Sequence, residues 1–210
     1  MIRIYYTSFH TPLHTAAFAD YLNAFPFEIQ KKILRFRKWQ DAHASLFGKL
    51  LLKKGLQDLH KDANLFAMKY TGYGRPYFEN GIDFNISHSG NHIVCAFADR
   101  GSIGIDIEEV KPIAVEDFKG IFIEEEWLNI LVADDPSRTF FRYWTAKESI
   151  VKALGIGLNA PLKQVHIREE TASLGGSIWY CKNISLFENY MLHIAFDQKP
   201  DNICLKKLCF

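Results

Sequence analysis

The segment 103–108, Ile-Gly-Ile-Asp-Ile-Glu, restricts how this chain can fold more than any other part of it. Successive side chains of a β-strand point to opposite faces, so the three isoleucines would share one face and Gly104, Asp106 and Glu108 the other. Two carboxylates on one face of an apolar strand repel each other and resist burial. A cation between them removes both penalties, so the pattern predicts a buried strand whose polar face meets positive charge.

A second segment, 144–152, has the pattern of a helix (Trp-Thr-Ala-Lys-Glu-Ser-Ile-Val-Lys). Residues four apart share a helical face, so Trp144, Glu148 and Lys152 would lie in line. Each motif alone has a plainer interpretation, because Asp-x-Glu occurs on exposed strand edges and Glu148 with Lys152 would make a surface ion pair worth roughly 0.3–0.5 kcal/mol. The two segments together offer carboxylates for a hard metal ion and lysines for phosphate oxygens, namely Asp106, Glu108, Glu148, Lys147 and Lys152.

A third segment, 84–90, ends an apolar strand in Ser87, His88, Ser89 and Gly90. A histidine between two serines, beside a chain turn, can meet a phosphate group with side chains and backbone N–H groups. Ser-His-Ser alone is usually an ordinary loop, so its weight comes from its combination with the other two segments.

These three segments resemble the signature motifs of the 4′-phosphopantetheinyl transferases, and the resemblance is to the monomeric, two-lobed type that activates surfactin synthetase. Residues 35–48 are similar to the first helical region of that family, and Gly74-Arg75-Pro76 to its short Gly-basic-Pro turn. Such enzymes use magnesium to move the phosphopantetheine arm of coenzyme A onto a serine of an acyl or peptidyl carrier protein, releasing 3′,5′-ADP. The resemblance therefore implies a transferase with coenzyme A and an apo-carrier protein as its two substrates.

The resemblance also implies an α+β fold of two pseudo-two-fold-related lobes, each a small, mostly antiparallel sheet packed with helices, with a ligand cleft between them. Residues 1–100 would form the N-terminal lobe with the nucleotide and phosphate contacts. Residues 101–210 would form the C-terminal lobe with the metal site and the catalytic helix. A faint repeat agrees with this division, since residues 93–99 and 191–197 are similar in apolar order and both carry Ala-Phe close to a final aspartate.

The family's functional residues are carried over by position. Asp106, Glu108 and Glu148 would hold Mg²⁺, whose preference for carboxylate, water and phosphate oxygens suits them. Glu148 would take the proton of the attacking serine, directly or through water, and Lys152 would stabilise or protonate the departing phosphate. The residues implied in binding coenzyme A are Lys32, Ser45, Arg75, Ser87, His88, Lys147 and Lys152.

Some of these assignments stay open at this point. The base is Glu148, Glu126 or a metal-bound water, and Lys147 either contacts phosphate or only supports its helix. Ile29 stands where some relatives have a basic residue, so one contact to the 3′-phosphate is expected to be absent. Arg75 replaces the lysine often found in its turn, which conserves charge but not geometry.

The composition fits a water-soluble enzyme. With 210 residues, 48% of them hydrophobic, the chain can build one large domain or two small lobes. A formal net charge of +1 does not indicate a nucleic-acid partner. The first residues do not resemble a signal peptide and no segment has the length of a membrane span, so we expect a cytoplasmic protein. No pair among the four cysteines has C-x-x-C spacing, so zinc is not expected.

Hydrophobic periodicity predicts strands at residues 2–7, 83–87, 92–98 and 103–108, and helices at residues 27–36, 41–59, 124–132 and 137–154. Gly155 and Gly157 would end the last helix. From residue 165 to residue 209 the chain is expected to form mostly strands, with turns at Gly175-Gly176 and Pro200.

Two functions of other classes are alternatives. One is a different magnesium-dependent phosphotransferase, against which the chain has no G-x-x-x-x-G-K-[ST] loop and no set of kinase motifs. The other is a non-catalytic homologue that binds carrier proteins, against which all three carboxylates and both helix lysines are present. Fatty-acid, polyketide, peptide-synthetase and lysine-pathway carriers all fit as substrates, because each presents a serine on a similar small helical domain.

Overall fold

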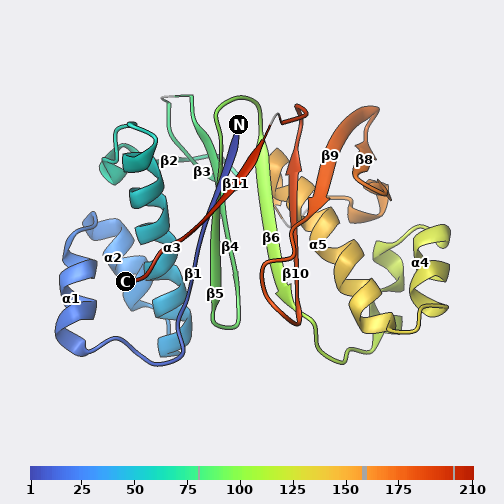
Figure 1. Cartoon of the computed structure of the whole chain (residues 1–210), viewed down its shortest axis with the longest axis horizontal. Coiled ribbons are helices and arrows are strands. Elements are labelled where there is room, and N and C mark those ends of the chain that lie inside the picture. Colours follow the sequence, from blue (N-terminus) through green and yellow to red (C-terminus); the bar gives the residue numbers. More distant parts are fainter. Residues whose placement is uncertain (80, 158–159, 201) are drawn as a thin grey trace.

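Two β-sheets stand side by side in the computed structural model of this chain, and helices lie on the outer side of each (Figure 1). The structure describes residues 1–79, 81–157, 160–200 and 202–210. The predicted class, an α+β fold of small, mostly antiparallel sheets packed with helices, is confirmed. No helix within the described ranges is both long and apolar enough to cross a bilayer.

The first sheet comes mainly from the N-terminal half of the chain. Its strands, in order across the sheet, are β11 (Ile203–Lys207), β1 (Ile2–Ser8), β5 (His92–Ala98) and β4 (Asp83–Ser89). Helix α3 (Trp39–Asp58) lies against one face, and α1 (Thr15–Asn23) and α2 (Phe27–Leu34) pack on α3. The α3 face that meets the sheet carries apolar side chains at helical spacing, Leu46, Phe47, Leu50 and Leu51, and all are buried.

A short irregular region joins α3 to β4. It contains the 3-10 helix η1 (Leu65–Ala67) and a two-stranded ribbon of β2 (Lys69–Tyr70) and β3 (Pro76–Tyr77). Gly74, at the turn of this ribbon, has a φ of 82°, which an L side chain rarely adopts. The Gly-basic-Pro turn found in the sequence therefore forms the tip of the ribbon and the start of β3.

The second sheet comes from the C-terminal half. Its order is β6 (Ile103–Glu109), β10 (Tyr190–Phe196), β9 (Ser177–Asn183), β8 (Thr171–Leu174) and β7 (His166–Arg168). Helix α5 (Pro136–Leu154) packs on β6 and β10, and α4 (Glu124–Leu131) packs on α5. The 3-10 helices η2 (Val115–Ile121) and η4 (Leu162–Gln164) flank them. As predicted, Gly155 terminates α5: it follows the last helical residue as a left-handed cap with a φ of 68°.

Strand β6 has the two faces that its alternation predicts. The side chains of Ile103, Ile105 and Ile107 are fully buried in an apolar cluster shared with the first sheet. The other face meets α5, which passes Gly104 so closely that a Cβ there would lie 1.8 Å from the carbonyl oxygen of Ser149. Only glycine permits this approach, and the approach brings the acidic face of β6 against α5.

The predicted elements are confirmed with small shifts at their ends. Helix α2 ends at Leu34, two residues early, and α3 begins at Trp39, two residues before the predicted start. Helix α1 is not predicted by the sequence, because only Leu22 of its residues is buried and its apolar periodicity is correspondingly weak.

The C-terminal strand departs from the predicted division into residues 1–100 and 101–210. Strand β11 pairs in parallel with β1, from Ile2 opposite Ile203 to Tyr6 opposite Lys207, so the last strand of the chain belongs to the first sheet. Without β11, β1 would be an open edge with unpaired backbone groups. The chain therefore passes between the sheets twice, after β5 and again after β10.

Candidate active site

The two sheets meet at β4 and β6, and polar side chains join these two strands where a backbone ladder would otherwise run. Every second residue of β4 is polar, and each of these side chains accepts a hydrogen bond from a backbone N–H of β6. We call this row of side chains the seam. Its four bonds are Asp83 Oδ2 to Ile103 N (2.8 Å), Asn85 Oδ1 to Ile105 N (3.0 Å), Ser87 Oγ to Ile107 N (3.4 Å) and Ser89 Oγ to Glu109 N (3.1 Å). The seam thus provides hydrogen-bond acceptors for the backbone N–H groups at the edge of β6.

Asp106, on β6, lies beside the seam, and its exposed fraction is only 3%. Its Oδ1 accepts hydrogen bonds from Ser87 Oγ (3.0 Å) and from Lys152 Nζ (2.6 Å), and Lys152 Nζ also donates to Ser87 Oγ (2.9 Å). Its Oδ2 is buried and, within the described part of the chain, has no hydrogen-bond partner. An unpaired buried carboxylate oxygen is costly, so Oδ2 is an atom to which a cation would bind favourably.

Glu108 and Glu148 complete an acidic cluster around Asp106. Both are half-buried. Burial raises the pKa of the Glu108 carboxyl, and the negative charge of Asp106 raises it further. Burial and the charge of Asp106 raise the pKa of Glu148 in the same way, with a smaller contribution from Glu108. Carboxylates that disfavour one another's ionisation favour a bound cation.

This donor set fits magnesium by its chemistry, because Mg²⁺ takes oxygen ligands from carboxylates, water and substrate phosphates. The unpartnered Oδ2 of Asp106 is the observation that favours a cation here. No group of three or more His, Cys, Asp or Glu side chains among the described residues is arranged to hold a metal ion by itself. A cation at this cluster would accordingly need oxygens from water or a bound phosphate as well as from the protein.

Lys147, for which the sequence left open a phosphate contact or support of its helix, lies in the core of the C-terminal lobe. It is fully buried, and its Nζ lies 2.8 Å from Glu126 Oε2, which is itself 1% exposed. The same ammonium group donates to the carbonyl oxygens of Leu162 (3.1 Å) and Val165. Its hydrogen bonds are therefore used inside the C-terminal lobe, and its position supports the alternative in which it holds the helix and the core.

Glu126 is held as firmly as Lys147. Its Oε2 accepts from the N–H of Ile123 (3.2 Å), and its Oε1 accepts from the N–H of Ile167 (3.1 Å). The first bond serves the N-terminus of α4, where Ile123 has no side-chain oxygen of its own. The pair therefore ties α5 to α4 and to β7, away from the acidic cluster.

A cavity of about 230 Å³ opens beside the acidic cluster. The residues that line it include Arg75, Asn85, Glu148, Lys152 and Gly155. Arg75 Nη2 donates to Asp83 Oδ2 (2.8 Å) and to the carbonyl oxygen of Ile103 (2.9 Å), so the guanidinium group bridges the two lobes. Its Nε is buried without a partner among the described residues. A guanidinium with a free donor beside a cavity suits a phosphate oxygen.

His88, on β4, is exposed to solvent, as is Lys32 among the residues predicted to bind phosphate. Partial burial of its ring lowers its pKa, and the positive charge of Lys152 lowers it further, while Asp41 and Asp106 act in the opposite direction. The imidazole therefore lies within the electrostatic reach of both α3 and the acidic cluster.

Lys32 and Ser45 lie on α2 and α3. Lys32 Nζ lies 3.9 Å from the centre of the Tyr70 ring, a cation–π contact. Lys49 follows Ser45 by one helical turn and has no hydrogen-bond or ion-pair partner among the described residues. Burial lowers the pKa of Lys49, and the nearby charge of Lys32 lowers it too. Ile29 is 4% exposed and packs in the core of the first lobe.

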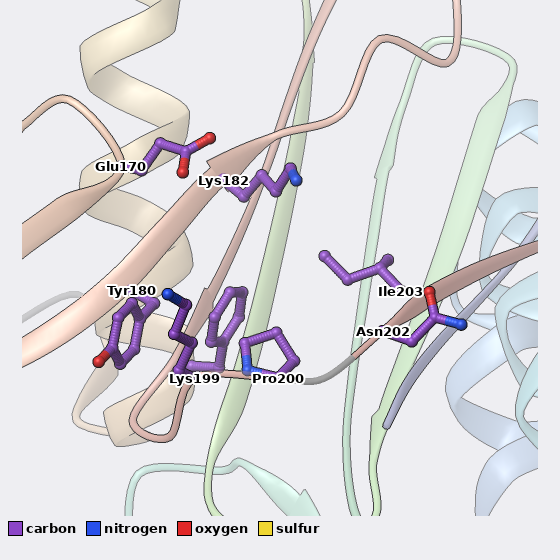
Figure 2. Close-up of a pocket in the computed structure, with 8 residues that line it drawn as sticks. Glu170, Tyr180, Lys182, Lys199, Pro200, Asn202 and Ile203 are labelled. Carbon is purple, nitrogen blue, oxygen red and sulfur yellow. The ribbon is translucent and has the colours of Figure 1, made fainter.

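A larger cavity, of about 290 Å³, lies elsewhere on the molecule (Figure 2). Tyr180 and Lys182 of β9 form one side of it, and Asn202 and Ile203 at the start of β11 form the other. The rings of Tyr180 and Phe196 stack there with centroids 5.8 Å apart. None of the residues that the sequence predicts for the site lines this cavity, so cavity size does not mark the site.

Sequence reasoning missed the seam: it gave no role to the side chains of Asp83 and Asn85, and it placed Ser89 only in a phosphate-binding turn. The signal that would have found them is in the sequence: every second residue from Asp83 to Ser89 is polar, and the residues between them are apolar except His88. In a strand these polar residues share one face, and a polar face on a largely buried strand requires partners. The partners are the N–H groups of β6 and, for Ser87 and Ser89, the carboxylates of Asp106 and Glu108.

Comparisons with known proteins place the chain in a family. Residues 102–195 match the model of the 4′-phosphopantetheinyl transferase superfamily, and residues 11–99 match the model of a 4′-phosphopantetheinyl transferase N-terminal region. The chain is 37% identical over 146 residues to the 4′-phosphopantetheinyl transferase Sfp of Bacillus subtilis (strain 168), across 67% of this chain and 65% of that protein. It is 36% identical over 143 residues to the transferase gsp of Aneurinibacillus migulanus, across 67% of this chain and 60% of that protein.

A third relative is matched over more of its length. This chain is 33% identical over 172 residues to another 4′-phosphopantetheinyl transferase of Bacillus subtilis, across 80% of this chain and 76% of that protein. The matches to the first two relatives span just under two thirds of their lengths. The two family models match consecutive segments of the chain, and the match over residues 102–195 contains β6 and α5 with the whole acidic cluster. The chain belongs to the 4′-phosphopantetheinyl transferase superfamily.

Proposed function

We propose that this protein transfers the 4′-phosphopantetheine arm of coenzyme A to a serine of an apo acyl or peptidyl carrier protein and releases 3′,5′-ADP. The observation that carries the proposal is the acidic cluster of Asp106, Glu108 and Glu148, which lies beside Lys152 on the seam. The names of the relatives support the same activity, since each is a 4′-phosphopantetheinyl transferase.

The reaction is a phosphoryl-type displacement at coenzyme A. The serine oxygen of the carrier attacks the pyrophosphate phosphorus that bears the pantetheine arm. The bond from that phosphorus to the bridging oxygen breaks, and the bridging oxygen leaves with 3′,5′-ADP. The serine proton passes to a base, so that charge and atoms balance.

Glu148 is our candidate for the base. It lines the 230 Å³ cavity, and no hydrogen bond to another described residue occupies its carboxylate. The alternative, Glu126, is 1% exposed and is held by Lys147 and by two backbone N–H groups, so it is not available to a carrier serine. Lys152, 30% exposed in its side chain, would donate to the departing phosphate of 3′,5′-ADP.

Magnesium is part of the proposal. Asp106, Glu108 and Glu148 would hold it, and the bound ion supplies neutralisation of the charge on the phosphate oxygens. The unpartnered buried Oδ2 of Asp106 supports this placement. The chain's own contribution is to hold Asp106 and Glu108 together against their mutual repulsion, through Ser87, Ser89 and Lys152.

The contacts to coenzyme A are proposed from the positions of the polar and basic side chains. Arg75, Ser87 and His88 lie on or beside the seam, where they would bind the phosphates nearest the cluster. Lys32 and Ser45, on α2 and α3, would bind the nucleotide end of coenzyme A. Both walls of the site come from one chain, which supports a monomeric enzyme.

A panel of apo-carrier proteins tests the proposal. The purified protein, Mg²⁺ and coenzyme A are mixed with fatty-acid, polyketide and peptidyl apo-carriers, and the carriers are analysed by intact mass spectrometry. We expect the mass of one phosphopantetheine arm on the serine of at least one carrier, and no addition when a chelator replaces Mg²⁺. No addition to any carrier, while a known transferase modifies them all, would contradict the proposal and favour a carrier-binding protein without activity.

A further inference from the structure

The two serines of the seam, unlike Asp83 and Asn85, also hydrogen-bond to the acidic cluster: Ser87 to Asp106 and Ser89, at the end of β4, to Glu108. Ser89 Oγ accepts a hydrogen bond from the backbone N–H of Glu109 (3.1 Å) and donates its own proton to Glu108 Oε2 (2.9 Å). Asp83 and Asn85, earlier on β4, accept hydrogen bonds from the β6 backbone and do not contact the acidic cluster. Ser89, from β4 of the first lobe, therefore binds both the backbone and a carboxylate of β6 in the second lobe.

The direction of the Ser89 hydrogen bond is determined by its neighbours. An N–H can only donate, so the Glu109 N–H takes a lone pair of Ser89 Oγ. The hydroxyl has one proton, and that proton is left for the carboxylate of Glu108. Gly90, with a φ of 52°, turns the chain directly after Ser89, and a Cβ there would lie 2.6 Å from the hydroxyl oxygen of Tyr190. The end of β4 is thus fixed in place, and Ser89 with it.

Glu108 needs such a contact because its negative charge lies in an unfavourable environment. It is half-buried, it shares one face of β6 with Asp106, and the two negative charges repel each other. The side chain has three rotatable bonds and could relieve the repulsion by turning toward solvent. Among the described residues, Ser89 is the side chain that hydrogen-bonds to Glu108.

We propose that Ser89 is a positioning residue that holds the Glu108 carboxylate beside Asp106, in the orientation that binds the divalent cation. This inference rests on the proposed function, since the cation is the one assigned there to the acidic cluster. Hydrogen-bonding partners of metal ligands commonly act in this way, and their loss typically lowers metal affinity by about 10–100-fold.

The test measures binding of Mn²⁺, used as a spectroscopic substitute for Mg²⁺, by electron paramagnetic resonance with coenzyme A present. Ser89→Ala should raise the Kd for Mn²⁺ by about 10–100-fold. Ser89→Thr keeps the hydroxyl on a residue type that strands accept, and it should restore affinity to within a few-fold of wild type. The Kd for coenzyme A without metal should stay the same in both variants.

Asn85→Ala is the matched control for the loss of a seam bond, and because Asn85 also lines the 230 Å³ cavity, its Kd for coenzyme A without metal is measured alongside. It removes one seam bond to a β6 N–H, as Ser89→Ala does, but the lost side chain touches no carboxylate. Both alanine variants should lower the melting temperature, and only Ser89→Ala should weaken Mn²⁺ binding. A Glu108→Ala background gives a second check, since there Ser89→Ala should have no further effect on the Kd for Mn²⁺.

The outcomes separate the inference from the proposed function. If wild-type and Ser89→Ala protein bound Mn²⁺ with the same Kd, the proposed role of Ser89 would be wrong. The transferase proposal would still stand. Equal weakening by Asn85→Ala, or a Ser89→Ala effect that persists in the Glu108→Ala background, would overturn the role of Ser89 too. Wild-type protein that binds no Mn²⁺ with coenzyme A present would contradict the metal site itself, and the inference with it.

Discussion

Helix α5 carries the lysines of two lysine–carboxylate pairs, little more than one turn apart. The two pairs have the same chemical groups but differ in solvent exposure and in hydrogen bonding. Lys147 and Glu126 are 0% and 1% exposed, and backbone groups occupy their remaining hydrogen-bonding positions. Lys152 is 30% exposed in its side chain, and its partner Asp106 keeps one carboxylate oxygen unpaired. A sealed pair, one that is buried and has all its hydrogen bonds made, holds secondary-structure elements together. A pair beside a cavity, with an unpaired oxygen atom, can instead bind a ligand.

The largest expected effect concerns Glu148, on the cavity side of α5. Glu148→Gln keeps the size of the side chain and one oxygen but cannot accept the serine proton. Single-turnover transfer to the apo-carrier should fall by about 10²–10⁴-fold, while calorimetry should still show binding of coenzyme A. Glu125→Gln, at an exposed position of α4, is the control and should transfer normally. Normal transfer by Glu148→Gln would remove Glu148 from the chemistry.

The sealed pair should matter for stability. Lys147→Met leaves the buried Glu126 carboxylate without its counter-charge, and urea denaturation should show a loss of about 3–5 kcal/mol in the free energy of unfolding. The double variant Lys147→Met/Glu126→Gln removes both charges and should recover part of the loss. If Lys147→Met unfolded at the wild-type urea concentration but lost affinity for coenzyme A, Lys147 would be a phosphate ligand after all.

A third buried polar contact on α5 should make the free energy of unfolding depend on pH. His193 Nδ1 lies 2.7 Å from Thr145 Oγ1, and burial lowers the pKa of the imidazole to about 4 from 6.5. Between these values the unfolded chain binds one proton more than the folded chain, so the free energy of unfolding should fall as pH drops. The loss amounts to about 3 kcal/mol by pH 4. His193→Gln should flatten this part of the profile, and an unchanged slope would contradict the assignment.

The smallest expected effect concerns the phosphate contacts. Arg75→Ala and His88→Ala remove groups that would hold the coenzyme A phosphates equally in the ground and transition states, so KM should rise more than kcat falls. We expect an increase in KM for coenzyme A of about 10-fold for Arg75→Ala, the value of one charge-assisted hydrogen bond, and less for His88→Ala. A fall in kcat at unchanged KM would place either residue in the chemical step.

The sequence predicted the parts of this structure that local patterns determine. The alternation in residues 103–108 predicts β6 with its apolar and acidic faces, and the four-residue spacing predicts that Trp144, Glu148 and Lys152 share one face of α5, where all three are half-buried. Residue type and spacing suffice for these features, because both depend on the geometry of one element.

The features that the sequence did not predict depend on contacts between distant segments. Lys147 and Lys152 are the same residue type on one helix, and only tertiary packing buries the first against Glu126 and leaves the second beside Asp106. The seam likewise requires β4 and β6 to lie in matched register, which neither strand encodes alone. The pairing of β11 with β1 joins the two ends of the chain, and no local pattern indicates such a partner.

The comparison of the two pairs is tested most directly by Asp106→Ala, measured for transfer and for stability in the same preparation. Loss of Asp106 removes a proposed metal ligand but also relieves its repulsion with Glu108 and Glu148, and water can solvate the partly exposed Lys152. We predict loss of magnesium-dependent transfer in single-turnover mass spectrometry, with a change of less than about 1 kcal/mol in the free energy of unfolding without metal. Wild-type transfer, or a loss of stability as large as that of Lys147→Met, would contradict the account.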